Sequence, residues 1–186
     1  MTSPTTTVTH TSAGSRIEFQ VDQTFDDRKM RQYANGVTSV LHCHHYTGLF
    51  TQLAMDAEAL EGVKHLTDAS CEVFGKVLAG YYKTHGVEAV NDRLAIAEQY
   101  FGFSGLGEVR FEFGETEGRV TMPHAHVDEG WIKKWGERRA PVNHIGRGYI
   151  KAVWAAVFEK DPAACKVEET ASIVCGAPVS EFTVNW

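Results

Sequence analysis

The imidazole side chains of this sequence are the groups whose type and spacing could do chemistry. Five of the nine histidines lie in two short groups, His42, His44 and His45, and then His124 and His126. Neutral imidazole is a common ligand for zinc and iron. On an extended strand, residues two apart share a face with their Cβ atoms about 7 Å apart, which one metal ion can bridge. If the two groups converge, they predict a metal centre.

Each group also has a second interpretation. We expect the first group at a junction between a strand and a helix, where adjacent histidines can simply be exposed or hydrogen-bonded. There, flanking imidazoles favour the thiolate of Cys43, so a nucleophilic cysteine is the main rival to metal binding. The second group can be the solvated end of a strand.

Five further residues are candidates for a site. Glu98 lies on an apolar helical face, where it could be a ligand, a general base or the partner of a nearby arginine. His144 could contact a ligand or cap a helix, and Arg147 could bind a carboxylate through two parallel hydrogen bonds. Trp131 and Tyr149 are typical of a core but could also line an apolar substrate pocket.

Length and composition narrow the class of protein. The chain has 186 residues and a formal net charge of -6, with 24 acidic against 18 basic side chains. This predicts one domain and argues against binding to nucleic acid. No apolar run approaches the roughly 20 residues that cross a bilayer, so we expect no membrane contact and a cytoplasmic location. Four cysteines without regular spacing indicate reduced thiols.

Hydrophobic periodicity predicts how these residues are positioned. A polar Thr/Ser tract at 1–15 is expected to be a disordered tail, and 16–186 a single domain. Alternation predicts strands and a helical period predicts helices. The expected order is a hairpin at 30–42 turning at Asn35-Gly36, helices within 46–62, 62–85 and 87–101, strands at 109–113 and 119–126, a helix at 143–158, and strands at 165–170 and 182–186. This order predicts an α+β fold, an antiparallel sheet with helices packed on one face. The 143–158 helix is rich in Gly and Ala, so another part of the protein should approach it closely.

The carboxy-terminal third carries a resemblance to a known family. A strand pair is followed by the Gly/Ala-rich helix, then Val167-Glu168-Glu169-Thr170, a turn, and Glu181-Phe182-Thr183-Val184. Over 107–186 this order resembles the 4-vinyl reductase domain, a small-molecule-binding fold related to subunits of the vesicle-tethering transport-particle complex. The group that includes L-2-amino-thiazoline-4-carboxylic acid hydrolase-like proteins is also similar. The segment 42–46, which precedes a long helix, resembles the amino-terminal half of some standalone relatives.

One departure limits what the resemblance implies. These families commonly have two cysteines near the end of the chain, discussed as a metal or redox element, and here the two positions are Ser172 and Ser180. A role of those thiols therefore does not transfer. The resemblance implies the fold rather than a reaction, because such domains serve as sensors, assembly factors and enzymes.

Two functions follow as expectations. The first is a metal-dependent enzyme that opens a ring by hydrolysis or oxidises a small organic substrate. The two histidine groups would hold iron or zinc, and an apolar pocket would lie beside them, under the Gly/Ala-rich helix. The alternative is a non-catalytic small-molecule-binding or sensor protein that resembles the 4-vinyl reductase domain. A small molecule is the expected partner in both, and the resemblance implies a homodimer.

Overall fold

A five-stranded antiparallel sheet forms the centre of the computed structural model, which describes residues 9–40 and 42–186. Its strands run in the order β1-β5-β6-β8-β7, with bounds β1 His10–Thr11, β5 Gly107–Phe113, β6 Glu117–Ala125, β8 Ser180–Asn185 and β7 Lys166–Ala171. In β5, Val109, Phe111 and Phe113 are buried while Arg110 and Glu112 are exposed. This alternation leaves one face of the sheet to solvent and buries the other.

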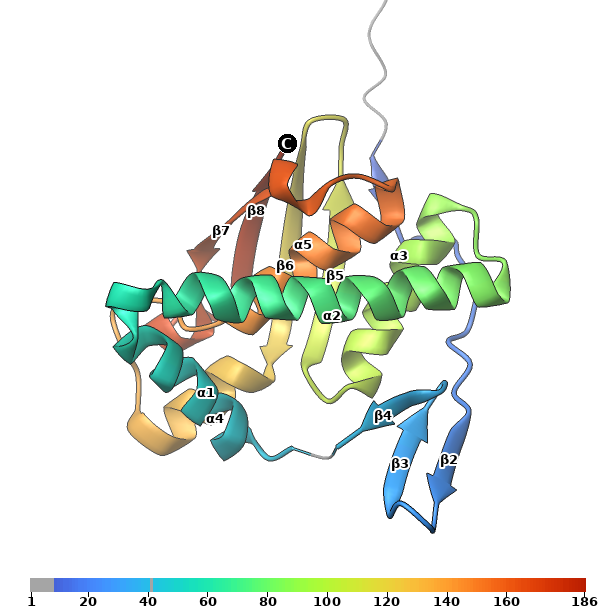
Figure 1. Cartoon of the computed structure of the whole chain (residues 1–186). Coiled ribbons are helices and arrows are strands. Elements are labelled where there is room, and N and C mark those ends of the chain that lie inside the picture. Colours follow the sequence, from blue (N-terminus) through green and yellow to red (C-terminus); the bar gives the residue numbers. More distant parts are fainter. Residues whose placement is uncertain (1–8, 41) are drawn as a thin grey trace, which may run out of the picture.

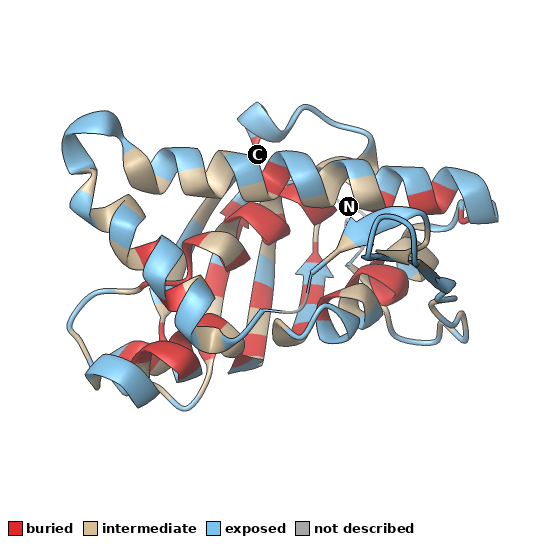
Figure 2. Cartoon of the chain, turned by 60° about the horizontal axis from the view of Figure 1, so that its bottom comes forward, coloured by how far each residue is buried: buried red, intermediate tan, exposed pale blue. Residues whose placement is uncertain are grey.

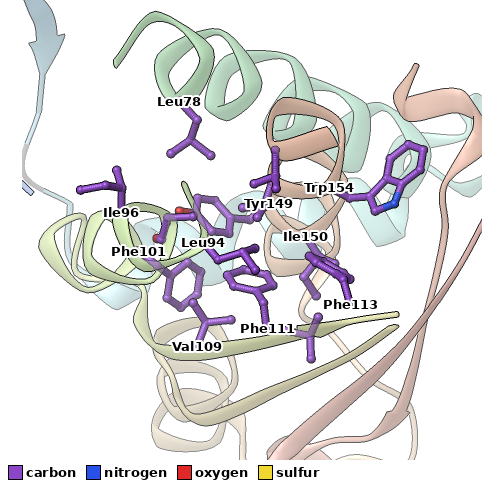
Figure 3. Packing of buried hydrophobic residues seen from close by; sticks show 14 of the residues in the cluster. Leu78, Leu94, Ile96, Phe101, Val109, Phe111, Phe113, Tyr149, Ile150 and Trp154 are labelled. Atoms are coloured by element: carbon purple, nitrogen blue, oxygen red, sulfur yellow. The ribbon is translucent and has the colours of Figure 1, made fainter. Parts of the chain in front are cut away.

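Helices cover the buried face. The helices α3 (Val90–Phe103) and α5 (His144–Phe158) lie against the sheet, and the long helix α2 (Gly62–His85) runs across α5 (Figure 1). Figure 3 shows Leu78 of α2, Leu94 of α3, Phe111 of β5 and Tyr149 of α5 meeting in the main core. The expected α+β fold, with helices on one face of an antiparallel sheet, is confirmed.

The Gly/Ala-rich helix α5 is approached closely, as the sequence predicts. A Cβ atom added at Gly148 would lie 2.4 Å from the carbonyl oxygen of Thr67 and 2.6 Å from the Cβ atom of Ser70, both on α2. Only glycine lets the two helix backbones come so near. Helix α2 therefore covers the slim surface of α5, where the sequence predicted an apolar pocket.

Two further helices pack beside this layer. Helix α1 (His44–Asp56) lies against α4 (His126–Trp135), and a small second core forms around Val127, Trp131, Val142 and Val174. Three short 3₁₀ helices, η1 (Glu58–Leu60), η2 (Pro162–Ala164) and η3 (Ile173–Cys175), connect elements. The strand expected to reach His126 ends one residue earlier, where α4 begins.

A separate three-stranded sheet precedes α1. It consists of β2 (Gln23–Asp26), β3 (Arg31–Ala34) and β4 (Val37–Ser39), and stands away from the main sheet (Figure 1). Asn35 and Gly36 have positive φ, which confirms the predicted turn. The last strand ends at Ser39 rather than at residue 42. None of these strand residues is buried, in contrast to the main sheet (Figure 2).

The described part of the amino-terminal segment is attached to the main sheet and to α3. Of the expected disordered tail, residues 1–8 lie outside the described residues, but His10 and Thr11 pair with β5. Ser15 donates a hydrogen bond to Asp92, 2.6 Å away. Within the described ranges, no helix is long and apolar enough to cross a membrane.

Candidate functional site

A cavity lies between the β2–β4 sheet and the helices α1, α2 and α3. This hairpin cavity has a volume of about 1030 Å³. Side chains of the small sheet and of α2 line it on opposite sides. A cavity of this size can hold a small organic molecule.

Its inner surface is an aromatic wall, which we define as Phe19, Phe74, Tyr81, Tyr100 and Phe103. The ring of Phe19 lies 4.9 Å from that of Tyr81, 5.5 Å from that of Tyr100 and 5.4 Å from that of Phe103, measured between centroids. These rings come from the segment before β2, from α2 and from the end of α3. Their spacing is that of mutually stabilising aromatic pairs, so the wall is preformed.

Polar groups at the aromatic wall are few. The Tyr81 hydroxyl accepts a hydrogen bond from the backbone N–H of Gln20 at 2.7 Å. Burial raises the pKa of the Tyr100 hydroxyl, so this group stays protonated at neutral pH. The lining is apolar over most of its area, and its polar groups include hydroxyls, amides, the His85 imidazole and the Lys76 ammonium group; such a lining suits an apolar ligand with a polar substituent.

The outer wall comes from the small sheet and from α1. Phe25, Tyr33 and Val37 line it on the sheet, and Tyr46 and Phe50 line it on α1. These side chains are the exposed side of the cavity, which is why the space is open rather than enclosed.

His42 is the one predicted site residue that lines the hairpin cavity. Its ring stacks on Tyr46 at 5.0 Å. It thus sits where α1 begins, apart from the other imidazoles of its group.

Three of the other imidazoles meet where α1 contacts α4. The His44 ring lies 4.2 Å from that of His45 and 6.2 Å from that of His126, again between centroids. Gly130 allows this approach, because a Cβ atom there would lie 2.6 Å from the His44 Cβ atom. Burial, and next the charge of His45, lower the pKa of His44, while burial lowers that of His126.

His124 lies elsewhere. Its ring is exposed and its Nδ1 atom lies 3.2 Å from the Glu129 carboxylate. The two rings of the His-x-His pair do not share a face, because β6 ends at Ala125 and His126 already belongs to a helix. Over residues 9–40 and 42–186, no three His, Cys, Asp or Glu side chains are grouped so that they could hold a metal ion.

The predicted catalytic residues lie apart from one another. Cys43 is exposed at the start of α1. The Glu98 carboxylate accepts a hydrogen bond from the backbone N–H of Phe111 at 3.1 Å, so it links α3 to β5, and burial raises its pKa. His144 is buried at the start of α5, where its Nδ1 atom contacts the Arg147 guanidinium. Burial, and next Arg147, lower the pKa of His144 to about 4, which keeps it neutral.

None of the predicted substrate-binding residues lines the hairpin cavity. Tyr149 is fully buried and donates a hydrogen bond to the Ala97 carbonyl oxygen at 2.6 Å. Trp131 packs in the second core with the Arg138 guanidinium 5.2 Å from its ring. Tyr149 lies in the main core because α2 and α3 pack on α5, whereas Trp131 lies in the second core because α1 and η3 pack on α4.

Arg147 belongs to a group of residues that sequence reasoning did not bring together. We define this buried polar cluster as Asp128, Arg147, Glu169, Ser172 and Ser180. In this cluster, Asp128 accepts a hydrogen bond from the Ser180 hydroxyl at 2.9 Å. Burial raises the pKa of Asp128 to about 6 and that of Glu169 to about 7. Among the described residues, neither carboxylate oxygen of Glu169 has a hydrogen-bond partner, and the Ser172 hydroxyl and the Arg147 Nε atom also lack one.

The two serines therefore sit inside this cluster, at the positions where the resembled families carry thiols. The Ser180 hydroxyl is engaged twice, with Asp128 and with the backbone N–H of Ile173 at 2.9 Å. Zinc and iron–sulfur groups prefer soft thiolate ligands, which a serine hydroxyl cannot supply. The residues present do not fit a thiol-ligated metal or a redox pair.

Comparison with known proteins gives the fold. Neither a family model nor a curated protein sequence matches the chain. Among solved structures, the chain is similar to the phenol-responsive sensory domain of the transcription activator PoxR, with phenol, at a TM-score of 0.70 and 14% identity over 88% of this chain and 84% of that chain. A trafficking protein particle complex subunit 3 from Naegleria fowleri, covalently bound to palmitic acid, matches at a TM-score of 0.44 and 13% identity over 75% of this chain and 94% of that one.

The chain thus shares the fold of a sensory domain. The expectation of a metal-dependent hydrolytic or oxidising enzyme is wrong, because the five histidines do not assemble into a metal centre in the described ranges and the fold is that of a sensory domain. What sequence reasoning missed is the hairpin cavity. The available signal was the row of aromatic residues at Phe19, Phe25 and Tyr33, just before the first histidine group.

Proposed function

We propose that this chain is a non-catalytic small-molecule-binding protein of the sensor type. Its ligand is a small aromatic molecule with one polar substituent, held in the hairpin cavity against the aromatic wall. The observation that carries this proposal is the wall itself, five rings from three separate segments that face an open space. Tyr81 belongs to the main core, and Phe19, Phe74 and Tyr100 are half-buried against it, so the wall is held rigidly at the edge of the cavity.

The fold supports the same proposal. The PoxR sensory domain, which has this fold, is described as phenol-responsive and was determined with phenol. We also infer that the sequence likeness to the 4-vinyl reductase domain reflects a family relationship, which the shared fold supports.

Calorimetric titration of the full chain tests the proposal. The probes are phenol and 1-naphthol, with cyclohexanol as a ligand of similar size that lacks the ring. Offset or edge-on contact with an aromatic ring adds about 0.5–1.5 kcal/mol beyond apolar burial, so the aromatic probes should bind roughly 2- to 12-fold more tightly than cyclohexanol does. Mass spectrometry should recover each probe unchanged.

A pair of variants locates the site. Phe103 and Trp135 are 39% and 43% exposed, so truncating either should disturb the fold equally little, but only Phe103 lines the cavity. Phe103→Ala should weaken phenol binding about 10-fold, while Trp135→Ala should leave it unchanged. Absence of saturable binding, or equal loss in both variants, would overturn the proposal.

A further inference from the structure

The lining of the hairpin cavity contains no carboxylate side chain. The chain has 24 Asp and Glu residues, yet none of them is among the described side chains that line the cavity. The basic side chains of the lining are Lys76, His42 and His85. In a protein with a formal net charge of -6, the cavity is therefore a region where negative side chains are missing and positive ones are not.

Three carboxylates that are near the lining in sequence have partners of their own. On α2, Asp68 pairs with Lys64 at 2.6 Å, and Glu72 pairs with Lys76. At the end of β2, Asp26 accepts two hydrogen bonds from backbone N–H groups of the turn that follows. The lining thus offers no negative partner to a positively charged ligand.

Lys76 lies on the face of α2 that borders the cavity. Val73, Val77, Gly80 and Thr84 also line the cavity, and residues three and four apart share one side of a helix. Nothing lies within 4 Å of a Cβ atom added at Gly80, so the helix surface one turn after Lys76 is open. The long lysine side chain can extend its ammonium group over this surface.

We propose that the ligand of the hairpin cavity is an aromatic carboxylate and that Lys76 determines this specificity by pairing with the carboxylate. The inference rests on the proposed binding function and names its ligand class. The ring of the ligand contacts the aromatic wall, to which Phe74 and Tyr81 of the same helix belong. A positively charged ligand would meet Lys76 and find no carboxylate in the lining, so the cavity selects against cations.

The pair with Glu72 leaves Lys76 available to a ligand. Both side chains are exposed, and exposed ion pairs are weak and are screened by salt. An ammonium group also has three hydrogen-bond donors, so it can contact a ligand carboxylate while it keeps Glu72. Glu72 therefore competes with the ligand without excluding it.

Calorimetric titration of the full chain with three naphthalenes tests the proposal. The probes are 2-naphthoate, 2-naphthamide and 2-naphthylmethylammonium, which share the ring and differ in charge. At low salt, 2-naphthoate should bind about 3- to 5-fold more tightly than 2-naphthamide, and the ammonium probe should bind most weakly. The preference for 2-naphthoate should shrink in high salt, because the charges at the open cavity are screened.

Variants on α2 assign the preference to Lys76. Lys76→Gln should bind 2-naphthoate and 2-naphthamide equally, whereas Lys76→Arg should retain the preference. The matched control is Lys83→Gln, which removes the same charge from an exposed position of α2 outside the lining and should retain the preference. Glu72→Gln should increase it about 2-fold, because the competing carboxylate is gone.

The outcomes separate this inference from the proposed function. Equal binding of 2-naphthoate and 2-naphthamide to wild type, tightest binding of the ammonium probe, or an unchanged preference in Lys76→Gln would overturn the role of Lys76 and leave the binding function standing. Absence of saturable binding for all three probes, together with phenol and 1-naphthol, would overturn both.

Discussion

The two parts of the chain differ in where their apolar side chains go. Among the described residues, every buried hydrophobic side chain lies at or after Cys71. The large exposed hydrophobic side chains lie between residues 21 and 73, with Phe103 and Trp135 as the exceptions. The later part thus forms a core (Figure 3), while the earlier part is largely exposed or half-buried (Figure 2).

This difference predicts that the later part of the chain determines stability, whereas the earlier part is free to take part in recognition. Burial of apolar surface drives folding, so the sheet with α2, α3 and α5 should set the free energy of unfolding. The β2–β4 sheet and α1 contribute little buried area, and their large apolar side chains remain exposed. Three substitutions in the later part, each with a control, measure this division.

Truncation in the core should have the largest effect. Phe111 is 1% exposed on β5, whereas Phe25 is 54% exposed on β2. Phe111→Ala should lower the free energy of unfolding by about 3–5 kcal/mol, because it removes buried surface and leaves a cavity. Phe25→Ala should lower it by less than about 0.5 kcal/mol. Urea denaturation measures both, and similar losses would contradict the division.

Separating α2 from α5 should have the next largest effect. Gly148→Ala forces a Cβ atom against the Thr67 carbonyl oxygen and should lower the free energy of unfolding by about 2–3 kcal/mol. Gly80 is the control, because nothing lies within 4 Å of its added Cβ atom on α2. Gly80→Ala should raise stability by up to about 1 kcal/mol. Thermal unfolding distinguishes the opposite signs.

Removing a charge from the buried polar cluster should have an effect that depends on pH and disappears in acid. The folded-state pKa of Glu169, about 7, lies above its ordinary value of 4.5, so folding favours the protonated form. Its contribution is fully present below pH 4.5 and is lost as the pH rises through 7. Above pH 7, Glu169→Gln should therefore be more stable than wild type by about 3 kcal/mol, and near pH 4.5 the difference should vanish.

The neighbouring residue supplies the control for this change. Glu168 is exposed on the same strand, and Glu168→Gln should leave the pH profile of wild type unchanged. Denaturation at pH 4.5 to 8 checks both variants, and a constant difference between Glu169→Gln and wild type would contradict the prediction. Because each variant is compared with wild type, the opposite pH dependence expected from His144 cancels.

Local patterns predicted the elements well. Alternation located β5 and β8, Asn35-Gly36 located the hairpin turn, and Gly86 ended α2 in the left-handed conformation. These features depend on residues near in sequence, so they are readable without the fold. Helix α4 was missed because Pro123 to His126 alternates like a strand up to the point where the helix begins.

The candidate site was predicted poorly, since its members come from separate segments. His44 and His126 do come near each other, but α4 begins at His126 and turns its ring away from the side that His124 takes. Tyr149 and Arg147 were expected at a pocket and lie in core and in the buried polar cluster. The hairpin cavity depends on where the small sheet stands relative to α2, which no local pattern contains.

The sequence by itself determined most of the helices and strands, the α+β class and the close approach to α5, because periodicity, turn residues and small side chains act through local geometry. Only the tertiary structure decided which aromatic residues face an open space and which imidazoles stay apart. Those outcomes follow from the packing of α2 on α5 and of α1 on α4, which brings together residues far apart along the chain.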